Sequence, residues 1–132
     1  MRRILVLLAL MVAGCGEDDQ AADYIKIAGG GLTFNYRYSQ ATMVVVGRQL
    51  TPPPAGSMLE ALFDIPGEKA RDVVSRPFMI GKLTYKLESK VLSGIKKGEP
   101  LKVTLRVVDP AGKELDRAET EYVSDVDQST LP

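Results

Sequence analysis

Apolar and polar side chains alternate with a period of two along most of this chain, and no other feature constrains its fold as strongly. The clearest stretch is residues 101–107, in which aliphatic side chains at the odd positions alternate with Lys102, Thr104 and Arg106. Successive side chains of a β-strand point to opposite faces of the sheet, so this pattern predicts strands with one buried face. The chain is therefore expected to be all-β.

Other segments carry strand signals of the same kind. Residues 43–46 are a continuous apolar run, which predicts a central strand buried on both faces. Gly29, Gly30 and Gly31 lack the spacing of a dinucleotide-binding loop and are expected to form a flexible entry to the first strand. Alternating strands are predicted at residues 32–38 (with Leu32, Phe34, Tyr36 and Tyr38 on one face), 59–63, 83–90 and, as a polar edge strand, 114–123.

Turn residues separate these segments. Proline fixes φ and lacks an amide donor, so Pro52, Pro53 and Pro54 predict an extended loop. Further turns are predicted at residues 64–67, 94–98 and, as a hairpin, 109–113. Residues 67–75 fit either one helical turn or a loop, with Ala70, Val73 and Val74 facing inward.

About seven short strands at turn spacing predict a small immunoglobulin-like or transthyretin-like β-sandwich. We place this domain at residues 24–124, after a polar tether at residues 15–23. Residues 125–132 are expected to be a flexible tail.

The N-terminal segment has the composition of a bacterial export signal. Arg2 and Arg3 precede an apolar run from Ile4 to Val12, and the run closes in Val12-Ala13-Gly14-Cys15. This arrangement resembles the lipobox of bacterial lipoprotein precursors. The resemblance implies that residues 1–14 are a signal peptide and that Cys15 receives a diacylglycerol and an acyl chain such as palmitate. The uncharged stretch is too short for a membrane span, which needs about 20 residues.

The same resemblance implies a location. In Gram-negative lipoproteins an aspartate after the lipidated cysteine favours retention in the inner membrane, whereas this chain has Gly16. We therefore expect a lipid-anchored protein on the periplasmic face of the outer membrane, with the inner membrane as the less favoured alternative.

Composition excludes several classes of activity. The chain has no histidine and a single cysteine, which argues against a Ser-His-Asp triad, the usual catalytic zinc site and a disulfide. Acidic and basic residues balance, so nothing favours nucleic-acid binding. We expect a protein that is not an enzyme and carries no cofactor or metal. The acids that a carboxylate enzyme could use are Glu114, Asp116, Glu119 and Glu121.

Two features are candidate partner-binding sites. Tyr36 and Tyr38 can stack on a sugar or a peptide if they are exposed; the alternative places them in the core with their hydroxyls at its rim. Pro52, Pro53 and Pro54 form a stiff segment suited to docking, or else simply a bridge between two sheets.

A row of lysines offers a third possibility. Lys82, Lys86 and Lys90 either meet anionic lipid headgroups or pair across strands with Glu119 and Glu121.

These features predict a membrane-anchored lipoprotein whose sandwich binds another envelope protein in an accessory or assembly role. The alternative function is binding of a small ligand or glycan through the tyrosines.

Overall fold

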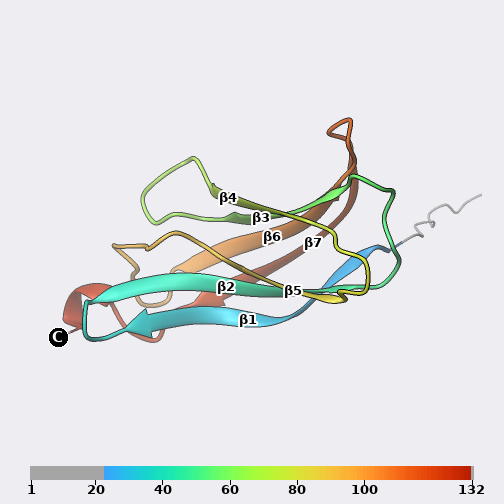
Figure 1. Ribbon diagram of the computed structural model, residues 1–132. Helices are drawn as coiled ribbons and strands as arrows, with labels where there is room; N and C mark the ends of the chain where they lie inside the picture. The colour runs from blue at the N-terminus through green and yellow to red at the C-terminus, as the bar shows by residue number, and fades with distance from the viewer. Residues whose placement is uncertain (1–22, 132) are drawn as a thin grey trace, which may run out of the picture.

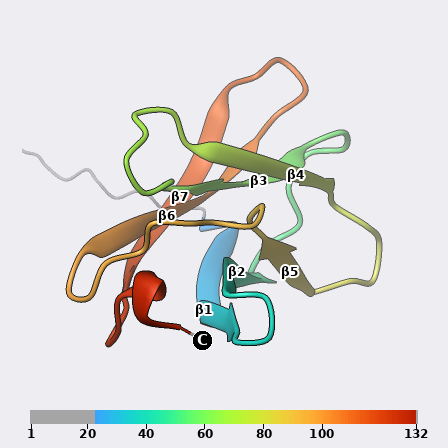
Figure 2. The same cartoon turned by 90° about the vertical axis from the view of Figure 1, so that its left-hand side faces the viewer.

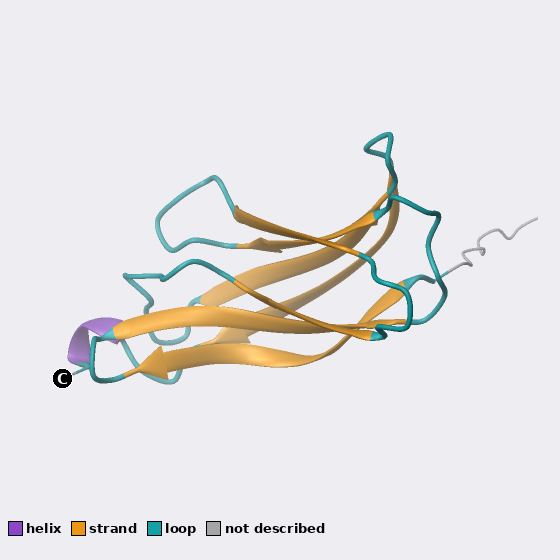
Figure 3. Cartoon of the chain, viewed as in Figure 1, coloured by secondary structure: helices purple, strands orange, loops and turns teal. Residues whose placement is uncertain are grey.

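Seven strands and one short helix make up the part of the chain that the computed structural model describes, residues 23–131. Cys15, the lipobox and most of the expected tether lie outside these residues. Every long element is a strand (Figures 1 and 3), and no helix in the described range is long and apolar enough to span a membrane. The elements are β1 (Ile25–Asn35), β2 (Gln40–Gln49), β3 (Met58–Phe63), β4 (Asp72–Pro77), β5 (Thr84–Glu88), β6 (Pro100–Val108), β7 (Glu114–Val123) and the 3₁₀ helix η2 (Gln128–Thr130).

The strands form two antiparallel sheets packed face to face. One sheet has the order β1-β2-β5 and the other β4-β3-β6-β7, so the chain crosses between sheets after β2, β4 and β5. The predicted small β-sandwich is confirmed. In constant-type immunoglobulin domains the fourth strand belongs to the sheet of the first, second and fifth strands. Here β4 pairs with β3 instead.

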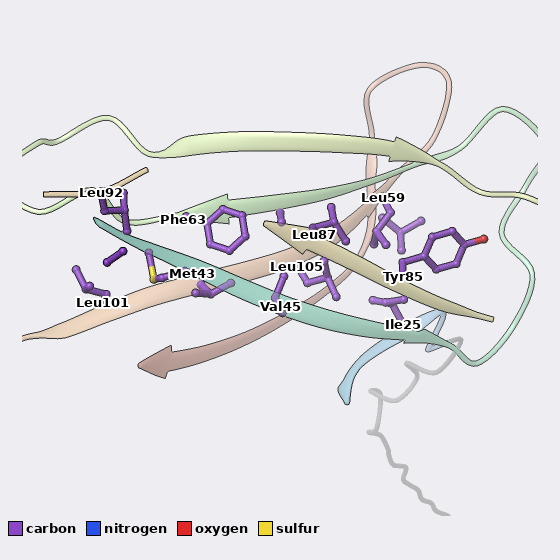
Figure 4. Close-up of a cluster of buried hydrophobic side chains, with 14 of the residues drawn as sticks. Ile25, Met43, Val45, Leu59, Phe63, Tyr85, Leu87, Leu92, Leu101 and Leu105 are labelled. Atoms are coloured by element: carbon purple, nitrogen blue, oxygen red, sulfur yellow. The ribbon is translucent and has the colours of Figure 1, made fainter. Parts of the chain in front are cut away.

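The core lies between the sheets, and the alternating residues build it. Leu101, Val103, Leu105 and Val107 of β6 are buried, as the period-two pattern predicts. Leu59, Ala61 and Phe63 of β3 meet Met43 and Val45 of β2 in the same cluster (Figure 4). Ile95, from the irregular β5–β6 connection, is also buried and closes one end of the cluster.

The first strand differs from the prediction. It runs from Ile25 to Asn35 and ends before Tyr36 and Tyr38, which lie in the turn to β2. Asn35 ends the strand because its backbone carbonyl accepts the amide of Tyr38, at 3.2 Å. The three glycines are not a flexible entry: they sit inside β1, where the register with β2 shifts between Ile27 and Gly29.

Three further expectations are corrected. Residues 43–46 belong to a central strand, but only one face is fully buried, because Val44 and Val46 point outward and remain half-buried. Residues 72–77 form edge strand β4 rather than a helical turn or loop, and Val73 is exposed. Leu83 lies just before β5 and is exposed, unlike Tyr85 and Leu87. The strand at 114–123 and the hairpin at 109–113 are confirmed.

The segment after Asp125 packs against the sandwich and does not extend from it as a tail. Gln128 is 6% exposed, and its side chain accepts the amide of Ile95 at 3.1 Å. The same side chain donates to the carbonyl oxygens of Ser39 and Leu92, at 3.0 and 2.9 Å. One buried amide thereby joins three separate segments, which fixes the C-terminal part as far as η2.

Candidate functional site

The two candidate sites named from the sequence lie at opposite ends of the sandwich (Figure 1). Tyr36 and Tyr38 occupy the β1–β2 turn, next to η2, at what we call the hairpin end. Pro52, Pro53 and Pro54 occupy the β2–β3 connection, beside the start of β1, at what we call the loop end. Strand β2 joins the two ends and has 10 residues, so they are roughly 30 Å apart.

The hairpin surface, defined as Tyr36, Arg37 and Tyr38, is exposed. The tyrosines are 58% and 61% accessible to solvent, so the alternative that placed them in the core is wrong. The side-chain oxygen of Asn35 accepts the amide of Arg37 at 3.1 Å, which forms a local turn. Ser39 completes the reversal with a φ of 52°. These local bonds fix the direction in which the three side chains project.

Ring contacts order the hairpin surface further. Phe34 at the end of β1 stacks with Tyr36 at a centroid separation of 6.4 Å. The guanidinium of Arg37 lies 5.8 Å from the ring centre of Tyr38. The side-chain amide of Gln128 in η2 donates a hydrogen bond to the carbonyl of Ser39, so η2 supports the hairpin (Figure 2). The surface is therefore organised before any partner binds.

A shallow pocket adjoins this hairpin on the outer face of its sheet. Its volume is about 210 Å³, below the roughly 300 Å³ from which small-molecule sites usually begin. Five of its seven lining residues have polar side chains, with Glu88 as the charged group, and Val91 is the exposed apolar residue. The lining residues are Thr33, Asn35, Gln40, Ala41, Thr42, Glu88 and Val91.

At the loop end the prolines form one wall of a groove. The prolines bridge the two sheets, as one of the two interpretations expected, and they also line this groove of about 350 Å³. The opposite wall is the β4–β5 connection, including Met79 and Ile80. Sequence reasoning missed these two residues, because an apolar pair without periodicity resembles a strand end. The lining residues are Gln49, Pro52, Pro53, Pro54, Ala55, Gly56, Phe78, Met79, Ile80 and Gly81.

Tyr85 holds the β4–β5 connection in place. Its ring is buried at one end of the core (Figure 4), and its hydroxyl oxygen accepts the amide of Met79 at 2.9 Å. The same hydroxyl lies 3.0 Å from the carbonyl oxygen of Lys82, to which it donates. Phe78 packs edge-on against the ring at 5.4 Å. The exposed turn is thus attached to the core by the hydroxyl of Tyr85 and by the ring of Phe78.

The four acids weighed for catalysis are each engaged within the fold. Arg117 lies between two of them, 2.9 Å from Glu114 and 3.1 Å from Glu119. The hydrogen bond from Arg117 is the main reason that the pKa of Glu114 lies below its ordinary value. For Glu119 the hydrogen bond from the Thr104 hydroxyl has the largest effect and also lowers the pKa.

The other two acids bind the backbone or face a cation. Asp116 accepts the amides of Tyr24 and Ile25, at 2.7 and 3.1 Å. Glu121 stands opposite Lys102 in the β6–β7 ladder. Within the described residues no cluster of three or more acids or cysteines suits a metal ion.

The expected pairing of Lys82, Lys86 and Lys90 with Glu119 and Glu121 does not occur. Lys86 lies on β5 of the first sheet, whereas both glutamates lie on β7 of the second. Strand pairing does not bring these elements together, and the ammonium of Lys82 instead lies 5.0 Å from the ring centre of Tyr85.

Comparisons with known proteins report little similarity. No protein-family model matches the sequence, and no curated protein matches it. Among solved structures, wild-type OgpA from Akkermansia muciniphila aligns with 81% of this chain at 13% identity and a TM-score of 0.43. The alignment spans 29% of the OgpA chain, so the present chain corresponds to less than a third of that protein.

Proposed function

We propose that this protein is a lipid-anchored envelope lipoprotein whose sandwich binds another envelope protein through the hairpin surface, without catalysis. The observation that carries the proposal is the preorganised turn that exposes Tyr36, Arg37 and Tyr38 together. Tyrosine and arginine are enriched among the residues that dominate binding energy at protein interfaces. A turn that is already ordered loses little conformational entropy when it docks.

The side chains of the hairpin surface indicate which chemical groups a partner should present. Arg37 forms no ion pair with any carboxylate among residues 23–131. Two exposed rings flank this cation, and such rings prefer a flat apolar surface. We therefore expect a protein partner that presents a carboxylate to Arg37 and apolar area to the rings.

The anchor belongs to the same proposal. Lipidation of Cys15 would place the domain at the periplasmic face of the outer membrane, as the lipobox implies. Several acyl chains give stable attachment, whereas a single chain binds only marginally. In this proposal the lipid anchor places the domain at the membrane, and the hairpin surface binds the partner protein.

Photo-crosslinking in cells, followed by direct binding measurements, tests the proposal. A crosslinking residue at position 38 should capture one abundant envelope protein, and the purified pair should bind. The double variant Tyr36→Ala/Tyr38→Ala should weaken that binding by at least about tenfold, because interface tyrosines commonly contribute more than about 1 kcal/mol each. Val73→Ala, which removes a side chain of similar exposure on β4, is the matched control. Equal affinity in the double variant and the control would reject the hairpin surface as the binding site.

Binding of a glycan or another small ligand is the second candidate, because the exposed tyrosines adjoin a polar pocket. Titration of purified protein with peptidoglycan fragments, followed by tyrosine fluorescence, decides between the two. Saturable quenching that disappears in Tyr36→Ala/Tyr38→Ala would favour the ligand. Fluorescence that stays constant, together with a captured protein, would favour the interface.

A further inference from the structure

We infer that the loop end of the sandwich rests on the phospholipid surface to which the chain is tethered, with Met79 and Ile80 entering the headgroup region. The inference rests on the proposed anchor at Cys15, which would hold this end of the molecule near the bilayer. It gives a role to the loop end, whereas the proposed partner binds at the hairpin end.

The chain enters the sandwich at this end. The amide of Leu50 in the β2–β3 connection donates to the carbonyl of Tyr24, at 2.8 Å, so the start of β1 lies against the proline loop. Residues 15–23 can extend at most about 30 Å, given roughly 3.3–3.6 Å per residue. An acyl chain on Cys15 would therefore keep the loop end near the bilayer.

The surface that this tether brings to the bilayer is apolar at its tip. Ile80 is fully exposed and Met79 is 57% exposed. They form the corner of a tight turn in which the amide of Lys82 donates to the carbonyl of Met79, at 3.1 Å. Gly81 follows with a φ of 82°, a conformation that suits the third position of such a turn. Leu50 and Leu83 are also exposed at this end.

The turn is held in this exposed position. The hydroxyl of the buried Tyr85 accepts the amide of Met79 and donates to the carbonyl of Lys82. Those bonds fix the backbone of the turn, and Met79 and Ile80 remain exposed while they line the groove. An apolar tip that is fixed outward enters a lipid interface without first being ordered.

Cations flank the tip. Arg48 on β2 pairs with Lys26 of β1 on one side and with Thr84 of β5 on the other. Lys82 precedes Thr84 by two residues along the chain. None of these three cations forms an ion pair with a carboxylate in the described part of the chain. Asp109 accepts two amides of its own hairpin, and Asp116 accepts those of Tyr24 and Ile25.

This combination favours a lipid surface over a protein partner. Apolar side chains that project beyond unpaired lysine and arginine are the arrangement by which peripheral proteins bind anionic membranes. A protein partner would have to fit between the loop end and the bilayer, within the reach of residues 15–23. Contact with lipid headgroups was one of two alternatives for the lysine row, and Lys82 of that row lies at this surface.

Tryptophan fluorescence provides a direct test, because the chain contains no tryptophan and a single cysteine. Residues 15–132, which include the complete core, are coupled through the Cys15 thiol to maleimide-bearing lipid in vesicles of phosphatidylethanolamine and phosphatidylglycerol. Ile80→Trp places the probe at the tip, and Val91→Trp is the matched control at an exposed valine of the hairpin end. Lipids with brominated acyl chains should quench the probe at position 80 severalfold more than the probe at position 91.

Equal quenching at the two positions would overturn the inference and assign the loop end to a protein partner. Met79→Trp repeats the test at the neighbouring position, so an effect of tryptophan peculiar to position 80 would be detected. Chemical coupling makes the result independent of lipidation in cells. The mass of the protein extracted from cells tests lipidation separately: an unmodified Cys15 would reject the proposed anchor and leave the vesicle result standing.

Discussion

The hydroxyl of Tyr122 donates a hydrogen bond of 2.9 Å to the backbone carbonyl of Val44, although the two residues belong to different sheets. The phenol reaches this carbonyl by passing over Gly30 in β1, where no side chain is in the way. Burial raises the pKa of this phenol above its ordinary value. This contact joins edge strand β7 of one sheet to central strand β2 of the other, across the position of a glycine in β1.

Tyr122→Phe should destabilise the fold by about 1 kcal/mol, because it removes this bond and leaves the Val44 carbonyl without its partner. Urea unfolding monitored by circular dichroism measures the change. Tyr38→Phe, which alters only an exposed phenol, should leave the free energy of unfolding unchanged. Two equal values would mean that the hydroxyl of Tyr122 contributes nothing to stability.

Gly30→Ala should be more severe, with a loss of roughly 3 kcal/mol. The added Cβ would overlap the Val44 carbonyl and the Tyr122 hydroxyl, and the φ of 132° at this position is unfavourable for alanine. Gly29→Ala is the matched control, because a Cβ there meets nothing within 4 Å. Thermal melting of the two variants should separate them clearly; similar melting temperatures would contradict the close approach at Gly30.

Gln128→Ala should cost about 2 kcal/mol, since it leaves the buried backbone groups of Ile95 and Leu92 without partners. Hydrogen exchange should also become faster around the hairpin surface, which loses its support at Ser39. Ser129→Ala, at an exposed neighbouring position, serves as the reference. Protection that is unchanged in Gln128→Ala would show that η2 does not support the hairpin.

Acid should weaken the fold through Glu114 and Glu119. Their pKa values in the folded state lie below the ordinary value of 4.5. Their contribution is therefore complete above that pH and is lost as the pH falls through the lowered values. Arg117→Gln removes the main cause of the shift at Glu114, so the free energy of unfolding should change less between neutral pH and about pH 3. An acid dependence identical to that of the wild type would contradict this assignment.

Tyr85→Phe should release the exposed turn while keeping its ring in the core. Hydrogen exchange at the Met79 amide, which the hydroxyl now protects, should become faster. The amides of the β2–β5 ladder should keep their protection. If exchange at Met79 did not change, the turn would not depend on Tyr85 for its order.

The alternation of apolar and polar residues predicted the strands that have one face in the core and the other in solvent. It failed where a side chain from another part of the chain covers the face expected to be in solvent. Thr104 was assigned to the solvent side with Lys102 and Arg106, yet it is fully buried. The side chain of Arg71 covers it and donates to its hydroxyl at 2.9 Å. Long charged side chains can cover a sheet in this way, and an alternation within one strand carries no information about them.

The candidate sites, too, could be predicted from the sequence only in part. The sequence pointed to Tyr36 and Tyr38 as a pair but left their exposure open, because that depends on where β1 ends at Asn35. The prolines were recognised by composition alone. The exposure of Met79 and Ile80 could not be predicted, because it depends on the hydrogen bonds by which Tyr85 holds their turn. These hydrogen bonds are local, but neither the alternation of apolar residues nor the composition of the segments reveals them.

Strand β2 connects the two ends of the molecule without interruption and pairs with a neighbour on both sides. A partner that pulled on the hairpin surface against an anchored N-terminus would load the sandwich along its strands. Strand β1 runs from the N-terminal side directly into that hairpin, so its covalent backbone would carry the tension and the ladder with β2 would only keep the strand in place. With the proposed anchor and partner in place, the sandwich would act as a tie between them, and one continuous strand would form the link.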